Sequence, residues 1–233
     1  FASRRCFDQV FLSAGYAGND ITVIGTDPGV CAAFNGGTHM PFEDVALYRA
    51  IPTATVFDIT DTVMFENLLR QAVRLPGIKY LRVGRKTSAK VYEEGSSFTP
   101  GQAVRLREGR DLTIVACGIM VHEALQAAGA LAEEGIEAEV LDMFTIKPLD
   151  EAALLASAQK TEAVLAAENH NRIGGLYAAV CEALARELPT PADCVAVNDE
   201  YGEVGPQDYL QQRYGLTAEN IQKKAKELMK RKK

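Results

Sequence analysis

Residues 112–141, LTIVACGIMVHEALQAAGALAEEGIEAEVL, decide the fold of this chain. The stretch opens on the short apolar run Leu112–Ala116 and closes on a second one, Ala138–Leu141, which starts 26 residues later. Between the two runs, apolar side chains recur at helical spacing from Val121 to Ala132, and a glycine follows where such a helix would end. Strands this far apart are too distant for a hairpin, so the stretch predicts a strand–helix–strand crossover with parallel strands.

The same pattern continues towards the C-terminus. Further apolar runs occupy Ala163–Ala167 and Cys194–Val197, and segments with helical spacing, Ala152–Ala158 and Leu176–Leu188, fill the gaps between runs. Alternating strands and helices of this kind build a mostly parallel sheet covered by helices. We therefore predict an α/β domain over residues 110–233.

The first half repeats the pattern less completely. We predict three strands, at Ile21–Gly25, Thr55–Phe57 and Tyr80–Val83. A helix near Ala2–Ala14 opens the chain, and Asp61 is placed to cap a second helix. The first helix has no strand before it, which is typical of an α/β domain that lacks its beginning. We assign this domain to residues 1–92, and the Gly-, Ser- and Pro-containing stretch 93–109 to a linker.

Composition narrows the class of protein. The chain has 233 residues, 47% of them hydrophobic and 24% charged, as in ordinary soluble globular proteins. A net charge of -6 argues against a nucleic-acid partner, and no apolar run approaches the ~20 residues that cross a bilayer. Five cysteines without a CxxC pair indicate reduced thiols, so we expect a cytoplasmic protein without a membrane partner, and no metal site of its own.

One short segment carries candidate chemistry. Asn35-Gly36-Gly37-Thr38-His39 follows a predicted strand, in the position where open α/β sheets bind ligands. Two glycines allow a close approach of backbone to a ligand, and a histidine can move protons near neutral pH. Taken alone, the segment fits either a tight structural turn or a ligand site. The next acidic pair, Glu43 and Asp44, is expected to cap or charge the helix that follows.

The order of several segments resembles the transketolase family. They run from residues 1–9 (FASRRCFDQ) through 26–30 (TDPGV), 36–44 (GGTHMPFED) and 48–52 (YRAIP) to 81–85 (LRVGR), and then through 116–125 (ACGIMVHEAL), 145–151 (TIKPLDE), 168–171 (ENHN) and 173–176 (IGGL). The chain is more similar to the short C-terminal subunit of split transketolases than to full-length enzymes. The resemblance implies two successive three-layer α/β/α domains: a truncated thiamine-diphosphate pyrimidine-binding fold, then a transketolase C-terminal fold with a mostly parallel sheet.

The resemblance also implies a cofactor and partners. Thiamine diphosphate would supply the carbanion chemistry of two-carbon ketol transfer, while Mg²⁺ would be held by an N-terminal partner subunit, since the GDG-type segment of the family is missing here. The family's catalytic glutamate falls upstream of Phe1. We therefore expect a chain that is inactive alone and works as a homodimer within a heterotetramer.

Individual roles follow from matching positions. By resemblance, His39 is the catalytic proton-transfer histidine, Phe1 an aromatic against the cofactor pyrimidine, and Arg85 the reader of a sugar phosphate. Asn35 and Asp27 are expected to contact substrate. All three of the following positions depart from the family. Asn35 stands where the family usually has an acidic residue, Asp27 where many members have a histidine, and Met40 where a glutamine is usual.

These departures leave other functions open. One alternative is a subunit like those of deoxyxylulose-phosphate synthase or the beta subunit of 2-oxoacid dehydrogenases, although Arg85 favours a sugar phosphate over a plain 2-oxo acid. An alternative of another class is a non-catalytic assembly or regulatory subunit. His170 and Asn171, which precede a second glycine pair, are predicted to be structural, with an anion site at the following helix start as the alternative.

Overall fold

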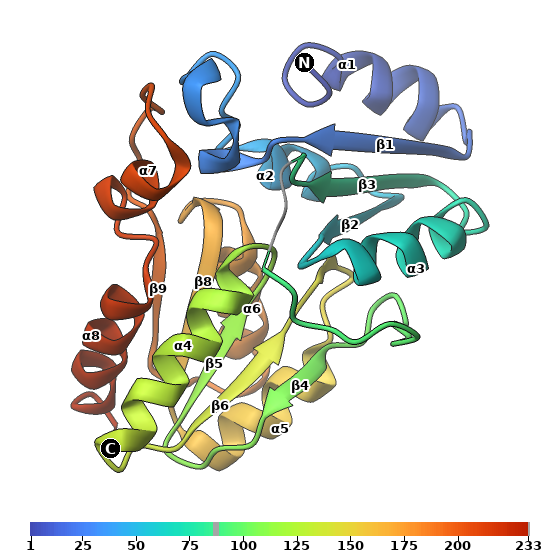
Figure 1. Cartoon of the computed structure of the whole chain (residues 1–233). Helices are drawn as coiled ribbons and strands as arrows, with labels where there is room; N and C mark the ends of the chain where they lie inside the picture. Colours follow the sequence, from blue (N-terminus) through green and yellow to red (C-terminus); the bar gives the residue numbers. More distant parts are fainter. Residues whose placement is uncertain (86–88, 233) are drawn as a thin grey trace.

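The chain folds around two sheets. The computed structural model describes residues 1–85 and 89–232, and it places a four-stranded and a five-stranded sheet, both mixed but mostly parallel, with helices packed around them (Figure 1). This arrangement confirms the predicted α/β class.

The five-stranded sheet belongs to the second half and has the strand order β4-β6-β5-β8-β9. Its four parallel strands are those predicted from the apolar runs, and a short antiparallel strand is added at one edge; the bounds are β5 Leu112–Ala116, β6 Ala138–Asp142, β8 Val164–Asn171, β9 Ala192–Val197 and β4 Val104–Arg107. Helices α4 (Met120–Glu133) and α8 (Ala218–Met229) pack on one face, and α5 (Glu151–Thr161) and α6 (Leu176–Glu187) on the other (Figure 1).

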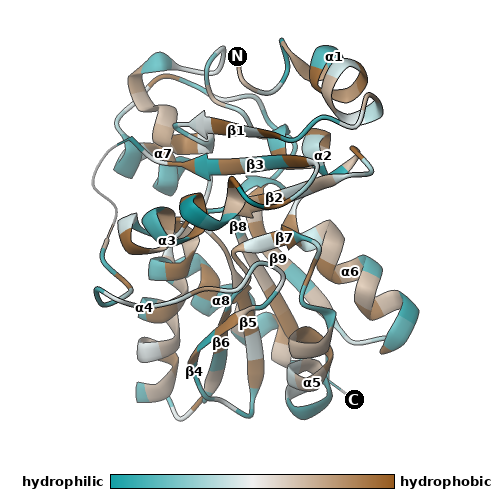
Figure 2. Ribbon diagram, turned by 90° about the vertical axis from the view of Figure 1, so that its right-hand side faces the viewer, coloured by the Kyte–Doolittle hydropathy of each residue, from teal (hydrophilic) through white to brown (hydrophobic). Residues whose placement is uncertain are grey.

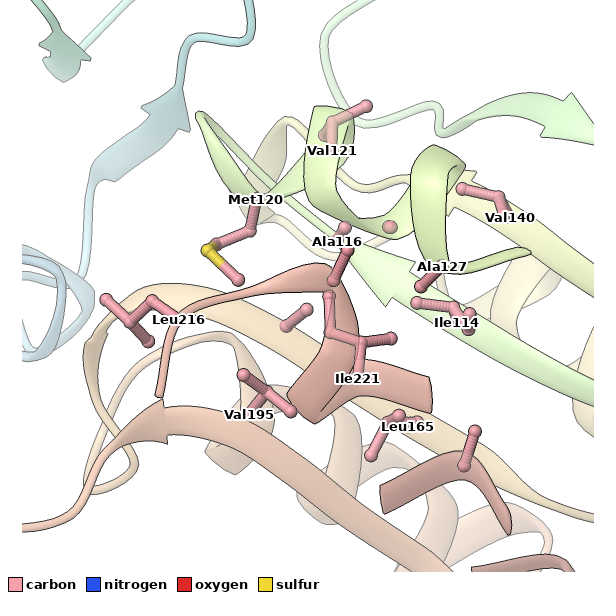
Figure 3. Close-up of a cluster of buried hydrophobic side chains, with 14 of the residues drawn as sticks. Ile114, Ala116, Met120, Val121, Ala127, Val140, Leu165, Val195, Leu216 and Ile221 are labelled. Atoms are coloured by element: carbon pink, nitrogen blue, oxygen red, sulfur yellow. The ribbon is translucent and has the colours of Figure 1, made fainter. Parts of the chain in front are cut away.

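Alternation along β5 explains the two cores on either side of this sheet. Ile114 and Ala116 point into the cluster under α4 and α8, together with Leu165, Val195 and Ile221 (Figure 3). Val115 and Cys117 lie in the opposite cluster, under α5 and α6. Because successive side chains of a strand face opposite sides, a continuous apolar run is what a strand covered on both faces requires. Figure 2 shows these strands as a hydrophobic centre with polar residues outside.

The four-stranded sheet has the order β1-β3-β2-β7. The three predicted strands are parallel, with bounds β1 Ile21–Thr26, β3 Ile78–Val83 and β2 Ala54–Asp58. The fourth, β7 (Thr145–Lys147), is antiparallel to β2 and comes from the second half of the chain. The first sheet is therefore completed by a segment that begins more than 60 residues after the end of β3.

Helix α3 (Thr62–Ala72) begins as predicted. The Asp61 side chain accepts a hydrogen bond from the Met64 N–H at 3.0 Å and two more from the N–H groups of Val91 and Tyr92. The carboxylate thus caps α3 and fixes the chain that leaves β3.

The structure differs from the sequence predictions at three places. The first helical segment runs through α1 (Phe7–Gln9) and the wider π-helical turns of η1 (Val10–Tyr16) instead of starting near Ala2, whose carbonyl accepts a hydrogen bond from the Tyr48 hydroxyl at 2.6 Å. Strand β4 lies within the stretch 93–109, and β7 crosses to the first sheet. The division into 1–92, 93–109 and 110–233 stays a prediction.

Three shorter segments complete the chain. They are the 3₁₀ segment η2 (Gly29–Asn35), helix α2 (Asp44–Arg49) and helix α7 (Gln207–Arg213). Among the described residues, no helix combines the length and the apolar character that crossing a bilayer requires.

Candidate active site

A cleft lies at the carboxyl ends of β1 and β3. It has a volume of about 310 Å³, and all five residues singled out from the sequence line it: Phe1, Asp27, Asn35, His39 and Arg85. The other lining residues are Ala2, Ser3, Arg4, Ile24, Gly25, Thr26, Thr38, Pro41 and Tyr80. Parallel strands bring their carboxyl ends to one edge, which is where α/β sheets bind ligands. Segments up to 84 positions apart in sequence thus meet at one site.

The Gly36-Gly37 turn positions His39 in this cleft. Gly36 has a φ of 71°, which favours glycine, and its carbonyl accepts the His39 N–H at 3.0 Å. A Cβ on Gly37 would lie 2.2 Å from the Gly202 carbonyl oxygen, so only glycine fits there. The turn is therefore clamped by a loop of the second half of the chain, which the sequence alone did not indicate.

The His39 ring is exposed, and the Thr38 and Phe1 side chains contact it. Its Nδ1 shares a hydrogen bond with the Thr38 hydroxyl at 2.9 Å, and the Phe1 ring meets it edge-on with centroids 5.0 Å apart. A ring held on one nitrogen and open on the other can exchange a proton with a ligand in the cleft. Thr38, next to the histidine in sequence, was not singled out as a site residue.

Asp27 and Arg85 form an ion pair. Asp27 Oδ2 lies 2.5 Å from Arg85 Nε, and Oδ1 accepts the Arg85 backbone N–H at 3.2 Å. The Asp27 side chain is almost buried, while 63% of the Arg85 side chain is exposed. Asp27 therefore binds another protein side chain directly, a contact that the sequence did not predict.

A second group of charges lies beneath the cleft, entirely buried. Arg82 donates to Asp44 Oδ2 and Asp58 Oδ2, both at 2.7 Å, and to the Asn169 carbonyl at 2.9 Å. Tyr80 donates its hydroxyl to the same Asp44 oxygen at 2.7 Å. Burial alone would raise the pKa of Asp44, but Arg82 and His170 reverse this and hold it below its usual value. Asp44 lies in the first turn of α2, where it was expected to charge the helix, and its buried contacts to Arg82 and Tyr80 are an addition that the sequence did not predict.

The start of α6 is occupied by a carboxyl group of the protein itself, Glu168, whose pKa burial raises to about 7. Both oxygens of Glu168 accept backbone N–H groups, from Leu176 at 2.7 Å and Tyr177 at 2.9 Å. Burial lowers the pKa of the neighbouring His170 to about 4, so this ring is neutral at pH 7. Glu168 thus occupies the helix start at which an external anion would bind, which supports the structural interpretation of His170 and Asn171.

The cleft fits one side of a thiamine cofactor. It offers an exposed aromatic ring at Phe1 and an exposed imidazole at His39, but no glutamate is among its described lining residues. Within residues 1–85 and 89–232, no three His, Cys, Asp or Glu side chains gather as they would around a metal ion. The residues present suit the ring part of such a cofactor.

A buried carboxyl near the junction of the two sheets gives a testable pH dependence. Asp142 accepts the hydroxyls of Thr60 at 2.6 Å and Tyr92 at 2.7 Å, and burial raises its pKa to about 7. Between pH 4 and 7 the folded state keeps a proton that the unfolded state has lost, so this group's contribution to the unfolding free energy falls as pH rises. One group contributes at most about 1.4 kcal/mol per pH unit.

Asp142→Asn should remove this dependence, since the amide oxygen still accepts both hydroxyls but does not ionise. Relative to wild type, the variant should gain roughly 2–4 kcal/mol of stability between pH 4 and 7, measured by urea unfolding at each pH. Asp8→Asn, at an exposed position in α1, is the control. Parallel curves for Asp142→Asn and wild type would contradict the prediction.

Comparison with known proteins agrees with the geometry. Residues 1–89 match the family model for the transketolase pyrimidine binding domain, and residues 101–221 match the model for the transketolase C-terminal domain. A 6-deoxy-6-sulfo-D-fructose transketolase subunit of Clostridium sp. (strain MSTE9) is 48% identical over 232 residues, covering 100% of this chain and 72% of the relative.

Two further relatives extend the comparison. An apulose-4-phosphate transketolase subunit of Phocaeicola vulgatus is 36% identical over 99% of this chain and 74% of its own length. A solved structure described as a split gene transketolase, inactive beta4 tetramer, superposes with a TM-score of 0.94 at 38% identity and covers 100% of this chain and 75% of that one. Both family models, these identities and the matching fold lead to one conclusion: the chain belongs to the transketolase family.

Proposed function

We propose that this chain is the C-terminal subunit of a split, thiamine-diphosphate-dependent transketolase. It would transfer a two-carbon ketol unit from a ketose that carries a terminal anion to an aldose acceptor. The observation that carries the proposal is the single cleft in which a proton-transfer group, an anion-binding arginine, a polar amide and an exposed aromatic ring meet: His39, Arg85, Asn35 and Phe1.

Each side chain has a proposed task. When bound, thiamine diphosphate supplies the carbanion chemistry of two-carbon transfer. His39 gives and takes the proton of a sugar hydroxyl, and Thr38 holds its other ring nitrogen. Asn35 offers both a hydrogen-bond donor and an acceptor to a hydroxyl, whereas the family's usual carboxylate only accepts. Phe1 lies against the cofactor ring.

The substrate class follows from the relatives and from Arg85. The relatives' names specify a sulfonated ketose and a ketose phosphate, and both carry an anionic group at the end of the sugar. An exposed guanidinium at the cleft suits such a group because it donates two parallel hydrogen bonds. A ketose with a terminal phosphate or sulfonate is therefore the proposed donor.

The proposal includes an assembly. An N-terminal partner subunit would hold Mg²⁺ and the cofactor diphosphate, and a homodimer of this chain would form the centre of a cytoplasmic heterotetramer. The description of the split-gene relative as an inactive beta4 tetramer supports self-association and a need for a partner.

The direct test is reconstitution. This chain, the N-terminal subunit, thiamine diphosphate and Mg²⁺ are mixed and screened for two-carbon transfer from ketose phosphates and a ketose sulfonate. Transfer that requires both subunits supports the proposal. A fully assembled complex that transfers from no ketose would favour the non-catalytic alternative.

In that complex, Arg85→Ala should raise the KM for ketoses with a terminal anion. A hydrogen bond to a charged group contributes about 1.5–3 kcal/mol, so the increase should be roughly 10- to 100-fold. Donors without a terminal anion should be almost unaffected. The matched control is Arg70→Ala, which removes an exposed arginine on α3 that pairs with Glu66. Equal losses for charged and uncharged donors would contradict the anion-binding role.

A further inference from the structure

The ion pair between Asp27 and Arg85 is built into the ends of two strands. Thr26 and Val83 are partners in the β1–β3 ladder, and the Asp27 N–H extends that ladder with a bond to the Val83 carbonyl at 2.9 Å. The segments that follow these strands are thereby held side by side. Asp27 has a φ of 57°, a left-handed conformation that aspartate tolerates better than most residues. The surrounding contacts therefore fix its carboxylate in one place.

The Asp27 carboxylate contacts the backbone N–H and the Nε of Arg85. Its two oxygens take the Arg85 backbone N–H and Nε, at 3.2 and 2.5 Å. Among the residues that the structure describes, no hydrogen bond or ion pair uses the two terminal nitrogens of Arg85. A guanidinium held in this way still presents its two terminal nitrogens, with their N–H donors, to an anion.

The pairing also changes the charge that a ligand meets. Asp27 and Arg85 together have no net charge. Arg4, the other arginine among the described lining residues, lies 2.6 Å from the carboxylate of Glu43. Because the pair has no net charge, it attracts any anion more weakly than an unpaired arginine would, so the larger desolvation cost of a doubly charged group is offset less fully than that of a singly charged one.

We infer that Asp27 is a specificity-determining positioning residue, which makes Arg85 favour a singly charged terminal group, a sulfonate, over a doubly charged phosphate. This inference rests on the proposed function, because it concerns the same donor site. A sulfonate offers three acceptor oxygens with one charge, and a phosphate monoester is close to doubly charged at pH 7. The less fully offset desolvation of the phosphate, at a partly exposed site, corresponds to a preference of roughly 5- to 10-fold for the sulfonate.

The test compares three donors with the same ketose skeleton: 6-deoxy-6-sulfofructose, fructose 6-phosphate and fructose. They are assayed with the reconstituted complex at about pH 7.5, where a phosphate monoester is mostly doubly charged. Wild type should favour the sulfonate over the phosphate in kcat/KM by roughly 5- to 10-fold, with the difference in KM and not in kcat. Asp27→Asn removes the negative charge and keeps one oxygen that can accept one of the two Arg85 bonds, so it should bring the two anions within about twofold by lowering the KM for the phosphate. Fructose should be unaffected, and Glu66→Gln, which uncouples the exposed Arg70 pair, should leave the ratio unchanged.

Three outcomes would overturn the inference: wild type favouring the phosphate, an Asp27→Asn ratio equal to that of wild type, or an equal loss for both anions. The last would mean that Asp27 only positions Arg85. Calorimetric binding of the two anionic sugars to the assembled complex measures the same ratio without turnover. Absence of transfer from all three donors would count against the proposed function, while the binding ratio would still decide the role of Asp27.

Discussion

Replacing Arg82 with methionine is expected to lower the free energy of unfolding by about 3–5 kcal/mol. The side chain is completely buried and donates to two carboxylates and a backbone carbonyl. Methionine fills a similar volume but leaves Asp44 and Asp58 as buried charges with their main cationic partner gone. Burying an uncompensated carboxylate is costly, and part of the cost will appear as protonation of these groups.

The measurement is urea unfolding of the purified chain at pH 7. The free energies of unfolding of the variant and of wild type are compared, provided that their m-values agree. Arg70→Met is the control, because its pair with Glu66 is exposed and such pairs contribute about 0–1 kcal/mol. A loss for Arg82→Met no larger than that of the control would show that the buried pairs only balance their own desolvation.

The second large effect concerns turnover. His39→Ala in the reconstituted complex is expected to lower kcat by about 10²- to 10⁴-fold, the usual contribution of a positioned acid–base group. Because the ring is exposed and its backbone bond to Gly36 does not involve the side chain, the fold and the affinity for thiamine diphosphate should change little. Steady-state kinetics and an equilibrium cofactor titration on the same preparation separate the two quantities.

His122→Ala provides the comparison for this variant. His122 lies on α4 and hydrogen-bonds only to Gln126 among the described residues, outside the cleft lining. Its loss should leave kcat within about twofold of wild type, as expected for a surface residue. A fall of less than about tenfold for His39→Ala would remove this histidine from the proposed chemistry, because a positioned acid–base group contributes more than that.

The parallel strands could be predicted from the sequence because each is covered on both faces. A strand such as Leu112–Ala116 must then be apolar throughout, and its neighbours must lie a helix apart. Strands β4 and β7 were missed for the opposite reason. Val104–Arg107 is a short strand of alternating apolar and basic residues, and Thr145–Lys147 has three residues, so only the strands they pair with make them visible.

The candidate site divides in the same way. The order of segments predicted which residues would gather, and the structure places all five in one cleft, while their roles stay predictions. The contacts between them were not predictable. Arg82 in the sequence Ile78–Val83 has the pattern of a solvent-facing strand residue, yet it is completely buried, because the charges that compensate it come from α2 and β2. Asp27 similarly acquires its partner only when two strand ends meet.

Strand β7 has a consequence for any attempt to isolate the first half of the chain. It covers the outer side of β2, whose N–H and C=O groups would otherwise form an open border of the sheet. Such borders readily recruit strands from other molecules. A fragment cut after residue 92 would lose this cover and become prone to self-association through β2. The three residues Thr145–Lys147, which belong to the second half of the chain, therefore protect the first half against aggregation through β2.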